Sequence, residues 1–120
     1  MKITSVKTHI LEAPLKVPFK WSFNRADTRA TVLVEITADN GLIGWGECLG
    51  PPLPIDAVIR SFQPLLKEAD VLSTDKVWQM LYDRSRDQGQ KGIVISAISG
   101  IDIALWDLKG KYYDQPIHRL

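Results

Sequence analysis

The side chains that could catalyse a reaction are few in this chain and lie far apart. His9 and His118 stand near opposite ends of the sequence, and neither is grouped with the serine and carboxylate that a nucleophilic triad requires. A lone histidine is more often a surface or structural residue than a catalyst. The single cysteine, Cys48, excludes an internal disulfide and a zinc site built from cysteines. We therefore expect no catalytic residue among these groups.

Two carboxylates, Asp102 and Asp107, lie in one expected helix. Positions five residues apart are separated by about 140° around a helix axis, so these two side chains cannot both ligate one metal ion from that helix alone. Capping or ion pairing with Lys109 or Lys111 is the expected role. The glycines of "GLIGWG" lead into a loop and not into a helix, which does not fit a dinucleotide site. The residues alone therefore predict no metal site in this chain.

The strongest candidate for binding is the segment 14–29, "PLKVPFKWSFNRADTR", which we expect to be a long loop between two strands. Phe19, Trp21 and Phe23 alternate along it. Exposed rings are costly unless they cover an apolar surface or a ligand, so a lid and a satellite core beneath the loop are both consistent with the pattern. A second segment, "YDRSRDQGQKG" (82–92), is basic and is either a solvated turn or a contact for an anion or a partner.

Composition limits the classes of partner. The 120 residues are 45% hydrophobic and carry 15 basic against 14 acidic side chains, so no strong field attracts nucleic acid or an anionic membrane. The N-terminus "MKITSVKTHI" lacks the apolar run of a signal peptide. No segment has the roughly 18 to 20 uninterrupted apolar residues of a membrane-spanning helix. We expect one domain, residues 1–120, in a cytoplasmic protein.

The pattern at the start of the chain predicts strands over 2–13, 31–37 and 42–49. Alternation puts Val32, Val34 and Ile36 on one face of the second strand. Asp39-Asn40-Gly41 then predicts a tight hairpin. In the third strand Gly44, Gly46 and Cys48 share a face that is nearly bare of side chains, so another element should pack close to it. The changing phase of apolar residues in the first strand predicts either a bulge or burial on both faces.

Helical spacing follows the prolines of "GPPLP". The first helix should begin near Pro54 and be kinked or split by Pro64. A second should be capped by Ser73 or Thr74 and stop by Gly89, and a third should run over 92–112. In the third helix a stripe of small residues, Ser96, Gly100 and Ala104, would permit close approach of a backbone. The expected fold is α+β: a three-stranded antiparallel meander followed by a bundle of about three helices.

The segment "AISGIDIALWDLKGKYYDQPIHRL" (97–120) resembles a signature in the N-terminal capping domain of the enolase superfamily, in its mandelate racemase and muconate lactonizing branch. The residues that match are Ala97, Ser99, Gly100, Ile101, Asp102, Ala104, Leu105, Asp107, Leu108, Gly110, Lys111, Pro116, Ile117 and Leu120. In the family the signature continues past the position of Leu120. Three short stretches resemble the galactarolactone cycloisomerase sub-family: "LVEI", "GWGECLGP" and "RDQGQ". Ile98 stands where that sub-family has a leucine.

The resemblance implies the capping, specificity-giving domain of a racemase, cycloisomerase or acid-sugar dehydratase, an isomerase or lyase that removes a proton next to a carboxylate. In that family a (β/α) barrel carries the Mg²⁺ ligands and the acid/base groups, and this chain has none of those positions. The family's two lid loops correspond to the segments with Phe19, Trp21 and Phe23 and with Cys48 and Leu49. Arg25 would pair with a substrate carboxylate or be a solvated loop residue.

The resemblance also implies partners: a small carboxylic or sugar acid, the chain's own C-terminal barrel, and further copies in a homo-oligomer. A stand-alone binding or interaction module without activity is the alternative. We expect the small-residue stripe and the bare strand face to be left uncovered in this chain, and hence to cause self-association.

Overall fold

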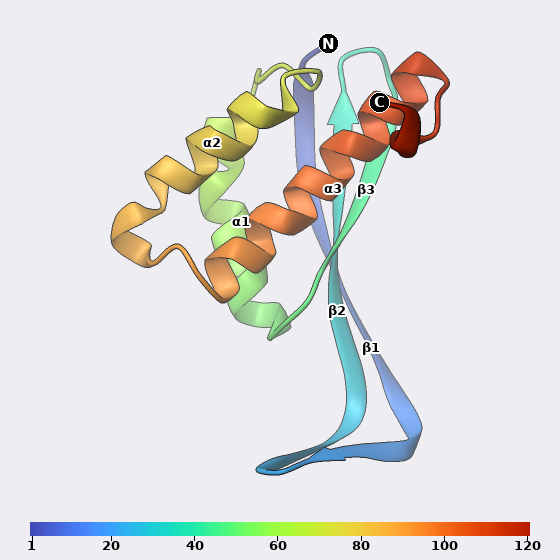
Figure 1. Cartoon of the computed structure of the whole chain (residues 1–120), viewed down its shortest axis with the longest axis vertical. Helices are drawn as coiled ribbons and strands as arrows, with labels where there is room; N and C mark the ends of the chain where they lie inside the picture. Colours follow the sequence, from blue (N-terminus) through green and yellow to red (C-terminus); the bar gives the residue numbers. More distant parts are fainter.

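A three-stranded antiparallel sheet carries three helices on one face in the computed structural model, which describes residues 1–120 (Figure 1). The strands lie in the order β1-β2-β3. Their bounds are β1 Ile3–Trp21, β2 Asn24–Ala38 and β3 Ile43–Cys48; the helices are α1 Pro52–Leu66, α2 Thr74–Arg84 and α3 Ile93–Tyr113, with short 3-10 turns η1 Arg86–Gln88 and η2 Ile117–Arg119. The expected meander followed by helices is confirmed.

The core lies between the sheet and the helices. Val32, Val34 and Ile36 are fully buried, as their alternation predicts. Gly41, with φ of 84°, closes the predicted hairpin between β2 and β3. The expected bulge in β1 is also present, between Ile3 and Ser5. From the helices the core receives Ile55, Ile59, Phe62, Leu66, Val77, Leu81, Ala97, Ile98, Ile101, Ala104, Leu105 and Leu108.

The bare face of β3 and the small-residue stripe of α3 pack against each other. A Cβ atom on Gly46 would overlap the Gly100 carbonyl, and one on Gly100 would overlap the Cys48 sulfur. Both backbones can approach this closely only because side chains are missing on both sides. The expectation that these two surfaces remain uncovered is therefore wrong: each covers the other, inside the chain.

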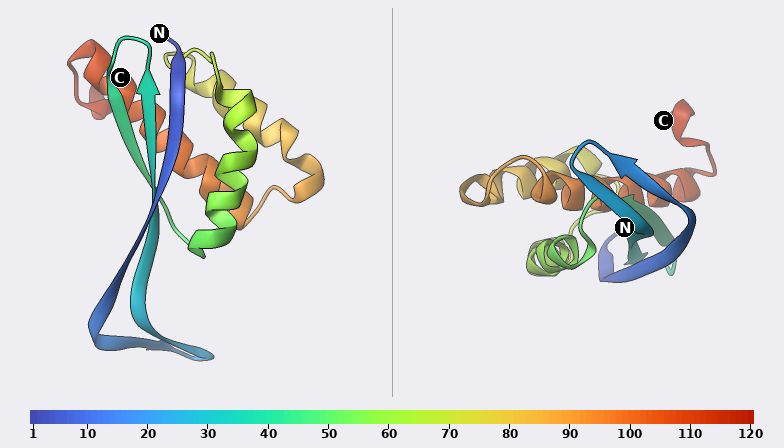
Figure 2. Two further views of the ribbon diagram at one scale, coloured as in Figure 1. Left: turned by 180° about the vertical axis from the view of Figure 1, so that it is seen from behind. Right: turned by 90° about the horizontal axis from the view of Figure 1, so that it is seen from below.

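The segment expected to be a loop is instead a β-hairpin. β1 and β2 stay paired out to Trp21 and Asn24, and Ser22 and Phe23 form the turn. Pro14 and Pro18 both lie in β1, which accommodates them because it is an edge strand of the sheet. Residues 12–30, called the arm below, extend beyond the helices and carry a sharp bend (Figures 1 and 2).

The bend coincides with a change of strand register. Pro14 lies opposite Thr28 and Phe19 lies opposite Ala26, so four residues of β1, 15–18, face a single residue of β2. Extra residues in one strand bend a ribbon and increase its twist. Pro14 precedes the inserted residues and Pro18 is the last of them, and neither can donate a hydrogen bond to a strand ladder. The sequence thus redirects the tip of the arm.

The helix boundaries differ in detail from the expected ones. α1 begins at Pro52, two residues before Pro54, and continues past Pro64 to Leu66, because a proline so near the end disturbs only the last turn. α2 ends at Arg84, before Gly89, and η1 fills the interval. α3 matches its expected range closely. None of the helices is long and apolar enough to cross a membrane.

Candidate functional site

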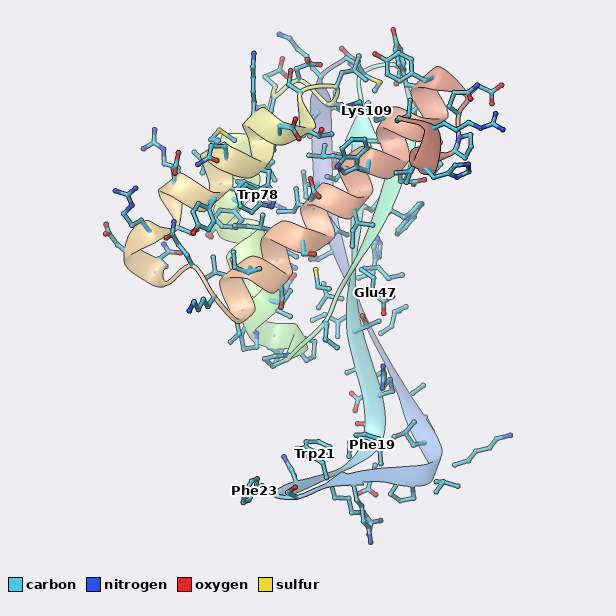
Figure 3. The ribbon with its side chains drawn as sticks, in the orientation of Figure 1. Phe19, Trp21, Phe23, Glu47, Trp78 and Lys109 are labelled. Carbon is cyan, nitrogen blue, oxygen red and sulfur yellow. The ribbon has the colours of Figure 1, made fainter.

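The tip of the arm presents aromatic and basic side chains on opposite faces. Lys20 lies directly opposite Arg25, so these two share one face, while Phe19 and Trp21 lie on the other. Phe19 and Trp21 have ring centroids 5.7 Å apart. In Figure 3 both rings lie on the side of the bent tip that is turned toward the helices, and Phe23 lies at its end.

The aromatic rings of the tip are open to solvent. Phe19 is 61% exposed, Trp21 48% and Phe23 97%. The alternative of a satellite core under this segment is therefore wrong for this chain, since no other element covers the rings. An apolar surface of this kind is typical of a contact site.

Arg25 is oriented by a neighbour in its own strand. Its Nε donates to Oδ1 of Asp27 at 2.7 Å, and both side chains are more than half exposed. Because Arg25 lies on the face opposite Phe19 and Trp21, a ligand resting on the rings would not meet the guanidinium. The structure does not bring the expected carboxylate-binding arginine together with the expected aromatic lid.

Leu49 and Cys48, the expected residues of the second lid, have opposite environments. Leu49 is 80% exposed just beyond the end of β3, whereas Cys48 is 1% exposed. The Cys48 sulfur lies in the core beside Gly100, and burial raises the pKa of its thiol to about 11. The expectation that Cys48 lines a lid is corrected: its side chain points inward, as the alternation with Gly44 and Gly46 dictates.

A cavity of about 370 Å³ lies where the arm meets the end of β3. We call it the arm-root cavity. The residues that line it are Arg29, Ala30, Thr31, Glu47, Leu49 and Ile103. The Thr31 hydroxyl donates to Oε1 of Glu47 at 2.9 Å and lies 3.1 Å from the Cys48 carbonyl oxygen. These residues come from β2, β3, α3 and the loop after β3, and only Leu49, in that loop, was expected from the sequence. The available signal was the outward position of Glu47 in β3.

The carboxylates of α3 and the histidine of β1 lie apart from one another. Asp107 pairs with Lys111 at 2.6 Å, as expected. Burial, together with the charge of Asp75, raises the pKa of Asp102, which accepts no hydrogen bond. His9 lies 2.8 Å from Glu35 on the outer face of the sheet and 5.4 Å from the Trp45 ring centroid. No group of three or more His, Cys, Asp or Glu side chains lies close enough together to hold a metal ion.

The basic segment before α3 remains open to solvent. Arg84, Arg86 and Lys91 are exposed and form no ion pair, and Gln90 donates from Nε2 to the Tyr82 carbonyl at 2.9 Å. This hydrogen bond fixes the turn between α2 and α3. The exposure of the three cations fits a solvated turn and leaves them accessible to an anion or a partner.

The chain is similar to several enzymes of known or assigned activity. It is 52% identical over 120 residues to D-galactarolactone cycloisomerase of Agrobacterium fabrum, covering 100% of this chain and 32% of the relative. It is 34% identical over 122 residues to D-galactonate dehydratase of Verminephrobacter eiseniae, covering 100% of this chain and 28% of that protein. The chain thus spans about a third of the length of the curated relatives it matches.

The fold agrees with a solved structure in the same group. The 3,6-anhydro-D-galactonate cycloisomerase of Zobellia galactanivorans superposes with a TM-score of 0.83 at 36% identity, over 94% of this chain and 29% of that one. Residues 3–120 match the model of the mandelate racemase / muconate lactonizing enzyme N-terminal domain. The family match covers nearly the whole chain, and the chain therefore belongs to the mandelate racemase / muconate lactonizing enzyme family, as its N-terminal domain.

Proposed function

We propose that this chain is the substrate-covering domain of a magnesium-dependent isomerase or lyase that acts on sugar acids, and that the catalytic barrel belongs to the rest of a longer protein. The similar proteins include cycloisomerases and a dehydratase of galactose-derived acids. This chain covers only 28–32% of the length of each of them. The reaction class that fits them is abstraction of a proton next to a carboxylate, as either isomerisation or dehydration.

The observation that carries the proposal is the exposed aromatic tip of the arm. A two-stranded ribbon is only marginally stable without further packing, and the arm exposes Phe19, Trp21 and Phe23 beyond the helical layer. In Figure 3 the bent tip carries Phe19 and Trp21 on its side toward the helices, and Leu49, which follows β3, is exposed as well. Both segments would then close over one site, excluding water and strengthening the electrostatic interactions within it.

Magnesium in such an enzyme stabilises the negative charge that develops when the proton is removed. The carboxylates of this chain do not fit a magnesium site. Asp107 is already bonded to Lys111 and to the Trp45 N–H, and Asp102 lies on the same helix but well around the axis from it. We therefore assign the metal to the proposed barrel. The role of this chain is to shape the site and exclude water.

Two experiments test the proposal. Sequencing the source gene past the codon for Leu120 should reveal a barrel with metal-binding carboxylates; a stop codon there, with no barrel encoded as a partner, would favour the stand-alone binding module. The purified chain, mixed with Mg²⁺ and a panel of sugar acids and lactones, should give no turnover in a chromatographic assay. Measurable turnover would contradict the assignment of catalysis to another domain.

We also propose that the full-length protein is a homo-oligomer, as the family resemblance implies. In this chain alone, the exposed apolar residues of the arm are the expected surface of self-association, in place of the α3 stripe, which is covered. Light scattering across a range of concentrations should show association of this chain, and a monomer at every concentration would contradict it. The cytoplasmic location expected from the sequence stays a prediction.

A further inference from the structure

We propose that a groove between α2 and the turn that precedes it binds a medium-chain monocarboxylic acid, with the acid's carboxylate on Lys76 and its alkyl chain on an apolar floor. The groove, called the turn groove below, is lined by Ala69, Asp70, Ser73, Lys76, Val77 and Met80. It lies near the N-terminus, at the end of the molecule opposite the tip of the arm (Figure 1). This site is separate from the proposed lid segments and goes beyond the proposed function.

The floor of the turn groove is apolar and continuous with the core. Val77 is 4% exposed and belongs to the core, and Ala69 and Met80 are partly buried against it. The volume of about 310 Å³ falls in the range of roughly 300–1,000 Å³ of small-molecule pockets. The unbranched Met80 side chain can adjust to the shape of a bound chain. The floor therefore favours an alkyl group over a polyhydroxylated one, whose hydroxyls would lose water without gaining a partner.

The two walls of the groove are held in place by the fold. On one side the turn is tied to β1, because the Ile3 N–H donates to the Ala69 carbonyl at 2.9 Å. On the other side Lys76 and Met80 lie one turn apart on the same face of α2. From Ser73 to Met80 the chain rises by about 10 Å along the helix axis. An alkyl chain of several carbons can lie along a groove of this length.

The carboxylate at the rim, Asp70, is occupied by donors of this chain. Its Oδ1 accepts from the Met1 ammonium at 3.4 Å and from the Leu72 N–H at 3.2 Å. Its Oδ2 accepts from the Ser73 hydroxyl at 2.9 Å. Because the ammonium offsets its charge, Asp70 neither competes for Lys76 nor strongly opposes an anion there. A second carboxylate on the ligand would lie unpaired on the apolar floor, which disfavours dicarboxylic acids.

Lys76 is the cation available in the groove. The ion pairs of the chain leave it without a carboxylate partner. Its neighbour Asp75 does not line the groove, and the charge of Asp75 acts on Asp102 of α3. A carboxylate at Lys76 would therefore gain an ion pair without breaking one. The first turn of α2, whose N–H groups have no partner within the helix, adds a favourable field for a negative charge.

The test is an NMR titration of the isotopically labelled chain at pH 7 with acetate, butyrate, hexanoate and octanoate. We expect saturable shifts of the Val77 and Met80 methyl groups with hexanoate, and an affinity that rises about two- to fourfold for each methylene added between butyrate and hexanoate. Acetate, which has the charge but no chain, should give no saturable shift. The absence of saturable shifts with hexanoate and octanoate, or equal affinities for butyrate and octanoate, would overturn the proposal.

Two further probes test the charged end of the ligand. Hexanol keeps the alkyl chain and lacks the carboxylate, and hexylammonium reverses the charge. Hexanol should bind about three- to fivefold more weakly than hexanoate, which is the effect of one solvent-exposed ion pair, and hexylammonium should bind more weakly still. Equal binding of hexanoate and hexylammonium would show that the carboxylate does not rest on Lys76.

Variants separate the ion pair from the apolar contact. Lys76→Met keeps an unbranched side chain without the charge, so it should weaken hexanoate binding about three- to fivefold and leave hexanol binding unchanged. Met80→Gln should weaken both, because it places an amide on the floor. The matched control is Lys91→Met, which removes an exposed lysine before α3 and should change neither. The amide spectrum of each variant reports its folding. If Lys91→Met weakens hexanoate binding as much as Lys76→Met, the effect is general charge attraction and the site is wrong. None of these outcomes depends on the activity of the longer protein.

Discussion

Asp107 of α3 accepts a hydrogen bond at 2.9 Å from the backbone N–H of Trp45, the third residue of the edge strand β3. Lys111, one turn later, donates to the same carboxylate at 2.6 Å and to the Ile43 carbonyl at 2.8 Å. Two side chains of the helix thus occupy polar groups that an added strand would use. Exposed strand edges are templates for aggregation, and covering them prevents it.

The first prediction concerns this contact. Asp107→Ala should lower the free energy of unfolding by about 1–2 kcal/mol, because it leaves a strand N–H without its charged acceptor. Asp107→Asn should cost less than half as much, since its amide oxygen still accepts from Trp45 and only the exposed pair with Lys111 is lost. Urea unfolding measures both. Equal losses in the two variants would show that the ion pair, and not the capped N–H, is the stabilising contact.

The second prediction concerns the close packing of α3 on β3. Gly46→Ala should destabilise the chain by about 3 kcal/mol or more, because the added methyl group overlaps the backbone of α3 at Gly100 and neither backbone can move without disturbing the core. Thermal or urea unfolding would measure the loss.

Ser96→Ala is the control for this substitution, because Ser96 lies on the stripe of α3 one turn before Gly100, the residue that Gly46 faces. Alanine favours a helix and Ser96 is only partly buried, so the change should stay within about 0.5 kcal/mol. A tolerated Gly46→Ala, with stability near that of the control, would contradict the described contact.

These elements also show which parts of the fold are predictable from sequence. The sheet follows from the alternation of Val32, Val34 and Ile36 and from Gly41, since both are local signals. The bare face of β3 and the stripe of α3 were each identifiable, but their mutual packing depends on how the chain folds back, which no local pattern specifies. The arm was missed because residues 15–18 form a large bulge, so alternation changes phase between its two ends.

The candidate site was only partly predictable for the same reason. Strand alternation places Cys48 on the same covered face as Gly44 and Gly46. The family resemblance instead assigned Cys48 to an exposed lid loop, and the structure shows that its side chain is buried. The arm-root cavity joins residues from three elements. Arg29 and Ile103 are 74 positions apart, from 103 − 29, and no motif connects them.

The third prediction is a pH dependence caused by Asp102. Burial, and secondarily the charge of Asp75, raises the pKa of this carboxyl above its usual value of 3.8 in the folded state. The folded chain then binds more protons than the unfolded chain in the window that begins near the unfolded value and ends above the raised one. The contribution of Asp102 to stability is therefore greatest at low pH and is lost as the pH rises through that window.

Asp102→Asn should accordingly raise the urea midpoint at pH 7 and leave a smaller decrease between pH 4 and pH 7. Asp75→Asn should act in the same direction and more weakly, since charge repulsion is the lesser cause. A lower midpoint for Asp102→Asn at pH 7 would mean that the charged carboxylate is stabilising, contrary to the direction of the shift.

The fourth prediction separates the role of the arm from the stability of the fold. The double variant Phe19→Ser with Trp21→Ser should change the free energy of unfolding by less than about 0.5 kcal/mol, because both rings are exposed and lie beside each other at the tip of the arm. Phe62→Ala, which removes a ring of the core that is 3% exposed, should cost about 3–5 kcal/mol.

The same double variant should reduce the self-association measured by light scattering, since it removes apolar surface only from the arm. A double variant that unfolds as readily as Phe62→Ala would place the rings in the core, and one that associates as strongly as the unmodified chain would assign the association to another surface.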